Sequence, residues 1–145
     1  MNEKLVTSLS ISQQMKEAGI EQKLDEGDWA YCSCCNKLHL FANDDDDNIY
    51  CIDHKIENVE EWHKAFTAGE LGEMLPKRKL INDRECSLRI WTNDTGEYWY
   101  CGYGRNGIME INGSHGKDKT LVESMAKMLI HLIQNGFINI SDIKI

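Results

Sequence analysis

The sequence lacks any apolar run that approaches the ~18 residues needed to cross a membrane. Its first residues, MNEKLVTSLSISQQM, contain neither an apolar core nor a small-residue cleavage site, so we do not expect a signal peptide. A basic stripe is also missing, because PKRK at residues 76–79 is the one dense cluster of positive charge. The formal net charge of −8 over 145 residues disfavours direct nucleic-acid binding, since acidic side chains repel phosphates. We therefore expect one domain, residues 1–145, in a cytoplasm, where clustered cysteines stay reduced.

Catalytic signatures are missing as well. The sequence contains no G-x-S-x-G, no H-E-x-x-H and no paired-carboxylate motif, and the deaminase pattern of H-x-E with P-C-x-x-C is absent. Cys86 and Cys101 have no identifiable base partner nearby in sequence. In the Gly-rich stretch NGSHGKDKT, Lys117 is followed by Asp118, which breaks the order of a P-loop. The sequence thus predicts a protein that is not an enzyme.

Cysteine and histidine gather in one segment of this acidic chain. Cys32 and Cys35 are spaced C-x-x-C, and Cys51 and His54 are spaced C-x-x-H. A tight turn directs residues i and i+3 at a common centre, so two such turns supply the four corners of a tetrahedron. Thiolates with an imidazole suit Zn²⁺, and four protein ligands leave no open position for water. The spacing predicts a structural zinc site held by Cys32, Cys35, Cys51 and His54.

Other interpretations of this segment stay open. Cys34 or His39 is an alternative to one of the four ligands, and a group of reduced, partly buried cysteines or a disulfide is an alternative to the metal. The acidic run Asp44–Asp47 does not fit an EF-hand, because Lys55 stands where the distal Glu belongs. We interpret that run as a solvated hairpin tip, or as an acidic contact for a basic partner.

Three segments combine helical periodicity with capping signals, namely 7–18, 67–75 and 120–135. Ser8 or Ser10 can cap the first helix. The other two begin with capping boxes, which are Thr67 with Glu70 and Thr120 with Glu123. The stop signals are Gly19, Pro76 and Gly136.

Strand signals fall in two regions. Residues 86–92, 97–104 and 108–111 alternate or are aromatic-rich, and NDTG and RNG between them are turn sequences. Strands at 29–32 and 48–52 flank the acidic run and predict a zinc-binding β-hairpin at about 29–56. Together the patterns predict an α+β fold, in which an antiparallel β-meander packs against two or three helices and the zinc hairpin is added.

The meander is rich in aromatic residues. Alternation places Tyr98 and Tyr100 on the face opposite to Trp99 and Cys101, so about half of the aromatic side chains are expected in the core. An exposed aromatic row would form a binding surface for a protein or a flat ligand. The Gly-rich loop that follows can hold an anion at a helix N-terminus. The candidate contacts for a ligand or partner are therefore Trp91, Trp99, Tyr100, His115 and Lys117.

Three stretches resemble a family of small, uncharacterised proteins encoded by phages and prophages of Gram-positive bacteria. These stretches are TSLSISQQMKEAGIEQ, AFTAGELGEMLP and AKMLIHLIQNGFI, and they occur in the same order over about a third of the chain. The members of that family generally lack the cysteine–histidine segment. The family has no established activity, so the resemblance implies only a phage or prophage origin and an accessory, non-virion role.

Two functions are favoured by these observations, and a hydrolase with an unrecognised site is a third alternative. The first is an accessory protein that acts by binding a host protein, for example as an inhibitor of a host defence factor with its acidic face in a basic groove. The second is a sponge that binds a small nucleotide-like ligand with the aromatic sheet and the Gly-rich loop. An exposed aromatic meander would also favour a homodimer.

Overall fold

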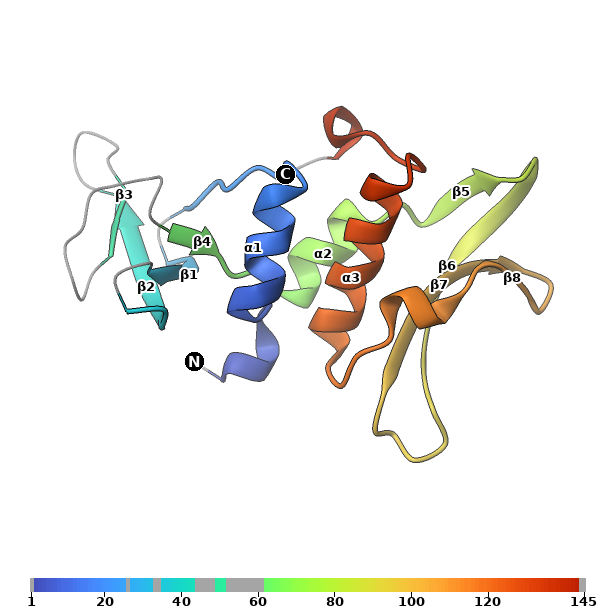
Figure 1. The fold of residues 1–145 in the computed structure, drawn as a ribbon, viewed down its shortest axis with the longest axis horizontal. Helices are drawn as coiled ribbons and strands as arrows, with labels where there is room; N and C mark the ends of the chain where they lie inside the picture. The colour runs from blue at the N-terminus through green and yellow to red at the C-terminus, as the bar shows by residue number, and fades with distance from the viewer. Residues whose placement is uncertain (1, 26, 33–34, 44–48, 52–61, 144–145) are drawn as a thin grey trace.

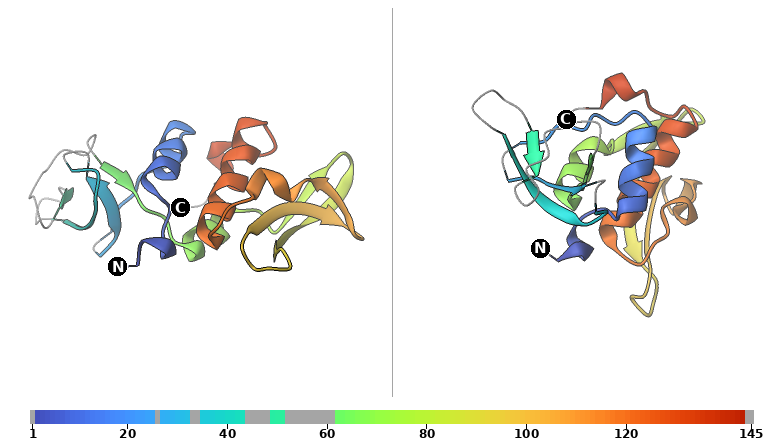
Figure 2. Two further views of the ribbon diagram at one scale, coloured as in Figure 1. Left: turned by 60° about the horizontal axis from the view of Figure 1, so that its bottom comes forward. Right: turned by 60° about the vertical axis from the view of Figure 1, so that its left-hand side comes forward.

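The protein is described by a computed structural model at residues 2–25, 27–32, 35–43, 49–51 and 62–143. Within these residues, three α-helices lie between two antiparallel four-stranded sheets, which confirms the α+β class (Figure 1). Figure 2 shows the same arrangement from two other sides. The helices are α1 (Leu9–Glu17), α2 (Ala68–Met74) and α3 (Leu121–Gln134), with short 3₁₀ turns η1 (Glu3–Leu5), η3 (Gly113–Gly116) and η4 (Ile140–Asp142).

The helices begin at the residues that the capping signals predicted. The Ser8 side chain accepts a hydrogen bond from the N–H of Ile11 at the start of α1. Thr67 and Glu70 form the complete capping box of α2. At the start of α3 the capping box is only half formed. Thr120 accepts from the N–H of Glu123, but the Glu123 carboxylate accepts instead from the backbone N–H and the hydroxyl of Ser8. A carboxylate on α3 thus helps to cap α1.

The meander has four strands in the order β5-β6-β7-β8, one more than predicted. Asn82 and Asp83 adopt positive φ between β5 and β6, as do Asn106 and Gly107 between β7 and β8, so both connections are two-residue turns with the twist that hairpins favour. The additional strand is β5, which contains most of the basic cluster. The strands are β5 (Arg78–Ile81), β6 (Arg84–Thr92), β7 (Trp99–Arg105) and β8 (Ile108–Ile111).

The second sheet differs from the predicted two-stranded hairpin. Its order is β3-β2-β1-β4, so the strands around Cys32 and Cys51 both pair with β2 and not with each other. We call these four strands the small sheet. It comprises β1 (Trp29–Cys32), β2 (Leu38–Asn43), β3 (Ile49–Cys51) and β4 (Trp62–Lys64).

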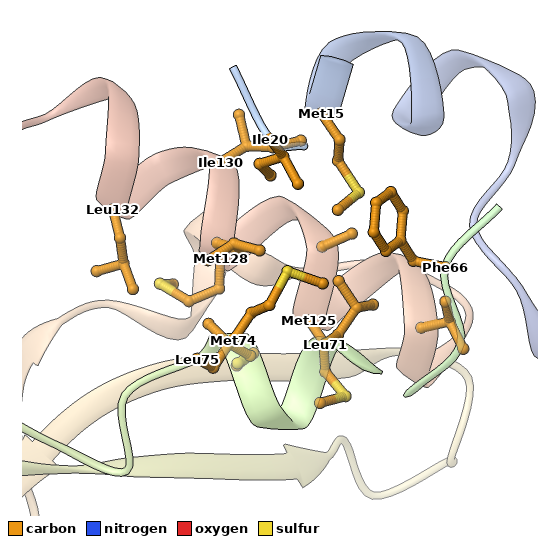
Figure 3. Close-up of a cluster of buried hydrophobic side chains, with 14 of the residues drawn as sticks. Met15, Ile20, Phe66, Leu71, Met74, Leu75, Met125, Met128, Ile130 and Leu132 are labelled. Atoms are coloured by element: carbon orange, nitrogen blue, oxygen red, sulfur yellow. The ribbon is translucent and has the colours of Figure 1, made fainter. Parts of the chain in front are cut away.

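The main core lies where the helices meet the meander. Figure 3 shows side chains from α1, α2 and α3 packed together, among them Met15, Leu71 and Met125. Cys101 and Tyr103 of β7 are fully buried against them. The small sheet has a separate cluster of four described residues, which are Leu24, Ala30, Phe41 and Trp62. Within the described residues, no helix has the length and apolar character that crossing a membrane requires.

Backbone and charge contacts attach the small sheet to the helices. The N–H of Thr7 donates to the carbonyl of Phe66, and the N–H of Phe66 donates to Thr7 Oγ1. Lys64 of β4 is only 4 % exposed, and its Nζ lies 2.7 Å from Glu70 Oε2 on α2 and 2.8 Å from the carbonyl of Lys23. These contacts attach the small sheet to α2 and to the segments on either side of α1.

Candidate functional site

The face of the meander that is turned away from the helices carries the strongest candidate site. In the β6–β7 register, Leu88 and Tyr103 oppose each other on the core face. Strand alternation then places Arg89 and Trp91 on the outer face, and Trp91 opposes Tyr100 there. We call this side of β6, β7 and β8 the outer face.

Two glycines let β8 fold closely over this outer face. A Cβ at Gly102 would lie 2.6 Å from the carbonyl oxygen of Ile111, and one at Gly104 would lie 2.6 Å from that of Ile108. The register shifts between Tyr103 and Gly104, which bends β7 at this point. Only glycine fits these two positions, and the side chain of Met109 covers both.

The bend and the glycine floor leave a hollow of about 330 Å³ on the outer face. Large apolar side chains that are 37–57 % exposed line it together with two arginines. None of its described lining residues is acidic, although the whole chain carries a net charge of −8. We call this hollow the outer-face pocket; its main lining residues are Arg89, Trp91, Gly104, Arg105, Ile108 and Met109.

Three of the five predicted contact residues come together beside this pocket. The rings of Trp91 and Tyr100 stack with centroids 5.6 Å apart and planes 10° apart. Lys117 Nζ lies 4.5 Å from the ring centroid of Tyr98 and 5.9 Å from that of Tyr100. Gly113 of η3 contacts the Trp91 ring so closely that a Cβ there would lie 2.4 Å from it. The aromatic sheet and the Gly-rich loop therefore form one surface.

The other two predicted contacts lie elsewhere. The His115 ring stacks on His131 of α3 with centroids 3.9 Å apart, and burial, followed by the charge of His115, lowers the pKa of His131. Trp99 belongs to the strand face of Cys101 and forms a backbone bridge with Asp118. Arg89, Arg105, Ile108 and Met109 line the pocket but were not among the predicted contact residues. The alternation of CSLRIWT placed Arg89 on the face of Trp91, but the bulge that brings β8 over β7 has no clear sequence signal.

A larger hollow of about 510 Å³ lies between the N-termini of α1 and α3, and Ser8, Thr120 and Glu123 line part of it. Burial raises the pKa of the Glu123 carboxyl, against the lowering effect of the hydrogen bonds from Ser8. Both carboxylate oxygens are occupied by Ser8, so we assign this group a structural role that joins α1 to α3.

Replacing Glu123 by glutamine is expected to make stability less dependent on pH. The pKa of Glu123 is higher in the folded state than in the unfolded state. The stability that Glu123 contributes is therefore fully present at a pH below its unfolded-state pKa, and it is lost as the pH rises through its folded-state pKa. The amide keeps an acceptor for Ser8 without a buried charge. We expect urea unfolding from about pH 4 to about pH 8 to show that the free energy of unfolding of Glu123→Gln increases relative to that of the wild type as the pH rises. Exposed Glu73→Gln is the control, and a constant difference between Glu123→Gln and wild type would contradict the assignment.

The structure describes part of the cysteine–histidine segment. The N–H of Asn36 donates to the carbonyl of Cys32, and Asn36 has a φ of +57°, so Cys32 and Cys35 flank a tight turn. Cys35 Sγ lies 3.0 Å from His39 Nε2. The backbone of Cys51 opposes Phe41 in the β2–β3 register. Cys34, His54 and Asp44–Asp47 lie outside the described residues, and among the described side chains no three His, Cys, Asp or Glu form a metal-binding group. The donor types present, two thiols and an imidazole, fit Zn²⁺.

The remaining two cysteines belong to the core. Cys86 and Cys101 are both 0 % exposed. Burial raises the pKa of the Cys101 thiol to about 12, so this thiol is protonated near neutral pH. A nucleophilic cysteine requires a thiolate, and Cys101 is therefore a packing residue.

Comparison with known proteins gives no relative from which a role can be transferred. No protein-family model matches the chain, and no curated protein or solved structure matches it either.

Proposed function

We propose that the chain is a non-enzymatic binding protein that recognises another protein through the outer face of its meander. The outer-face pocket is the observation that carries this proposal. It exposes Trp91, Ile108 and Met109 side by side between Arg89 and Arg105. Tryptophan, methionine and arginine are the residue types enriched in protein interfaces, whereas a scattered exposed apolar residue needs no explanation.

The charge of the pocket defines the chemistry of the partner. Two arginines face solvent in a pocket that no described acidic side chain lines. An acidic segment with one large apolar side chain would pair with both guanidinium groups and fill the apolar floor. This contact differs from the one expected from the sequence, in which the acidic face of the chain would enter a basic groove.

The biological setting of the proposal comes from the resemblance. A phage or prophage accessory protein would meet its partner in the bacterial cytoplasm, so we propose a host protein, including a host defence factor, as the target. A second copy of this chain is the alternative partner for the same surface, because a homodimer would also cover Trp91 and Met109.

Affinity capture with matched variants tests this surface. We expect tagged wild-type protein to recover a saturable partner from lysate of a Gram-positive bacterium. Trp91→Ala and Arg89→Glu should each weaken that binding about 30-fold or more, as truncation of a central interface residue does. Lys4→Glu makes a similar charge reversal in η1, outside the meander, and should bind like the wild type.

Three results would contradict the proposal. They are the recovery of nothing saturable, equal binding by Trp91→Ala and wild type, and loss of binding in Lys4→Glu alone. Sedimentation of the purified protein distinguishes the second copy, because a dimer that Trp91→Ala dissociates would assign the surface to self-association.

A small nucleotide-like ligand is the second candidate, favoured by the stack of Trp91 on Tyr100 beside Arg89. A planar base can stack on an exposed indole, and guanidinium groups bind phosphate. Native mass spectrometry of the purified protein would show a retained ligand as a mass excess that disappears on denaturation and is missing in Trp91→Ala. A bare protein mass would count against this candidate.

We further propose that the small sheet holds one structural zinc ion through Cys32, Cys35, Cys51 and a histidine. The N–H groups of Cys35 and Asn36 both donate to the carbonyl of Cys32, which keeps the backbones of the two cysteines close together. The two apolar clusters of the sheet are small, with four described buried residues in one and three in the other, so a bound metal ion would add to its stability. When bound, zinc cross-links the strands and supplies folding free energy without taking part in a reaction.

A further inference from the structure

His39 of β2 lies beside the side chain of Cys35. In the β1–β2 register His39 opposes Ala30, so both side chains lie on one face. Cys32 follows Ala30 by two residues and shares that face. The same face carries the apolar cluster of Ala30 and Phe41, and Cys32 is only 2 % exposed.

The contact between Cys35 and His39 joins the tight turn to β2. Their Sγ and Nε2 atoms are 3.0 Å apart. Two ligands of one tetrahedral zinc ion, with bonds of about 2.3 Å to sulfur and 2.0 Å to nitrogen, lie about 3.5 Å from each other. The Sγ–Nε2 distance of this pair is therefore about half an ångström shorter than the spacing that a shared ion requires.

The β2–β3 register places the backbone of Cys51 next to the strand that carries His39. Cys51 opposes Phe41, which is two residues from His39 on the same strand. Cys32 and the backbone of Cys51 thus lie on β1 and β3, the two strands that flank β2, which carries His39. The geometry points to His39, in place of the His54 that the C-x-x-H spacing favoured, as the histidine ligand of the proposed zinc ion. This inference deepens the proposed zinc site and is independent of the outer-face pocket.

Zinc affinity in single variants of the full chain tests the assignment. We expect His39→Asn to weaken zinc binding by more than about 100-fold in competition with a chromophoric chelator, because even outer-shell partners of a metal cost 10–100-fold when lost. His54→Asn should bind within about 2-fold of the wild type. His39→Cys should restore tight binding as a fourth thiolate, which guards against a variant that simply fails to fold.

Cobalt substitution gives a second readout that a folding defect would not imitate. With Co²⁺ in place of zinc, the thiolate-to-metal absorption of the wild type should correspond to three thiolates, and that of His39→Cys to four. The reverse pattern, with binding lost in His54→Asn and kept in His39→Asn, would overturn the assignment. Unchanged binding in both variants would overturn it as well, in favour of Cys34 as the fourth ligand. A wild-type protein without zinc would overturn both the site and this inference, while partner capture by the outer face would be unaffected.

Discussion

Removal of the proposed zinc ion with a chelator is expected to unfold the small sheet while the main core stays folded. Structural zinc contributes about 10 kcal/mol or more to the folding of small metal-binding units. The small sheet packs into two small apolar clusters of four and three described buried residues, whereas the main core contains fully buried residues from all three helices and from the meander. The loss of the metal should therefore be felt locally, because α3 and β7 do not depend on the cysteine segment for their packing.

Hydrogen exchange before and after chelation measures this difference. Peptides that cover β1 and β2 should lose their protection, and peptides that cover α3 should keep it. Cys35→Ser is the matched control, because a protein without the site should not respond to the chelator. Unchanged exchange in β1 and β2, or the simultaneous loss of protection in α3, would contradict the account.

Replacing Phe66 by alanine is expected to destabilise the protein by about 3–5 kcal/mol, the cost of deleting a buried aromatic ring. Phe66 is 0 % exposed, and its side chain lies beside Met15 of α1 (Figure 3). Its backbone N–H and carbonyl both pair with Thr7, and the ring lies 5.2 Å from Lys64 Nζ. The residue therefore connects β4 of the small sheet with the helices.

Urea unfolding measures the loss of stability through the midpoint at constant slope. Leu5→Ala is the control, because Leu5 is 59 % exposed and its replacement should change the free energy of unfolding by less than about 0.5 kcal/mol. Phe66→Leu, which keeps much of the volume, should lie between the two. A loss of less than about 1 kcal/mol in Phe66→Ala would contradict the role that we give to this side chain.

Features that depend on a few neighbouring residues could be predicted from the sequence. The capping box of Thr67 and Glu70 closes within four residues, and its two hydrogen bonds are those that the motif implies. The turn at Asn106 and Gly107 needs two residues with positive φ, which these residue types accept readily. Local chemistry of this kind fixes the ends of helices and hairpins whatever the rest of the chain does.

Features that depend on distant partners could not be predicted. The Glu123 carboxylate does not complete the capping box of its own helix, because it accepts hydrogen bonds from two donors of Ser8, 115 residues earlier. No local sequence pattern indicates this long-range contact. The strand β2 was missed because its sequence lies inside the cysteine–histidine segment and its pairing with β1 and β3 is set by tertiary contacts. The outer-face pocket depends on a register shift beside Gly104, so the aromatic residues were found but the arginines and Met109 beside them were not.

Site-specific photocrosslinking tests the proposed contact surface most directly. A photoreactive residue replaces Ile108, which is 57 % exposed beside the outer-face pocket, or Leu5, which is 59 % exposed in η1. Both proteins are irradiated in lysate of a Gram-positive bacterium. The account predicts one dominant adduct from position 108 that untagged wild-type protein competes away and Trp91→Ala does not, with no such adduct from position 5. Equal adducts from the two positions, or none from position 108, would contradict it.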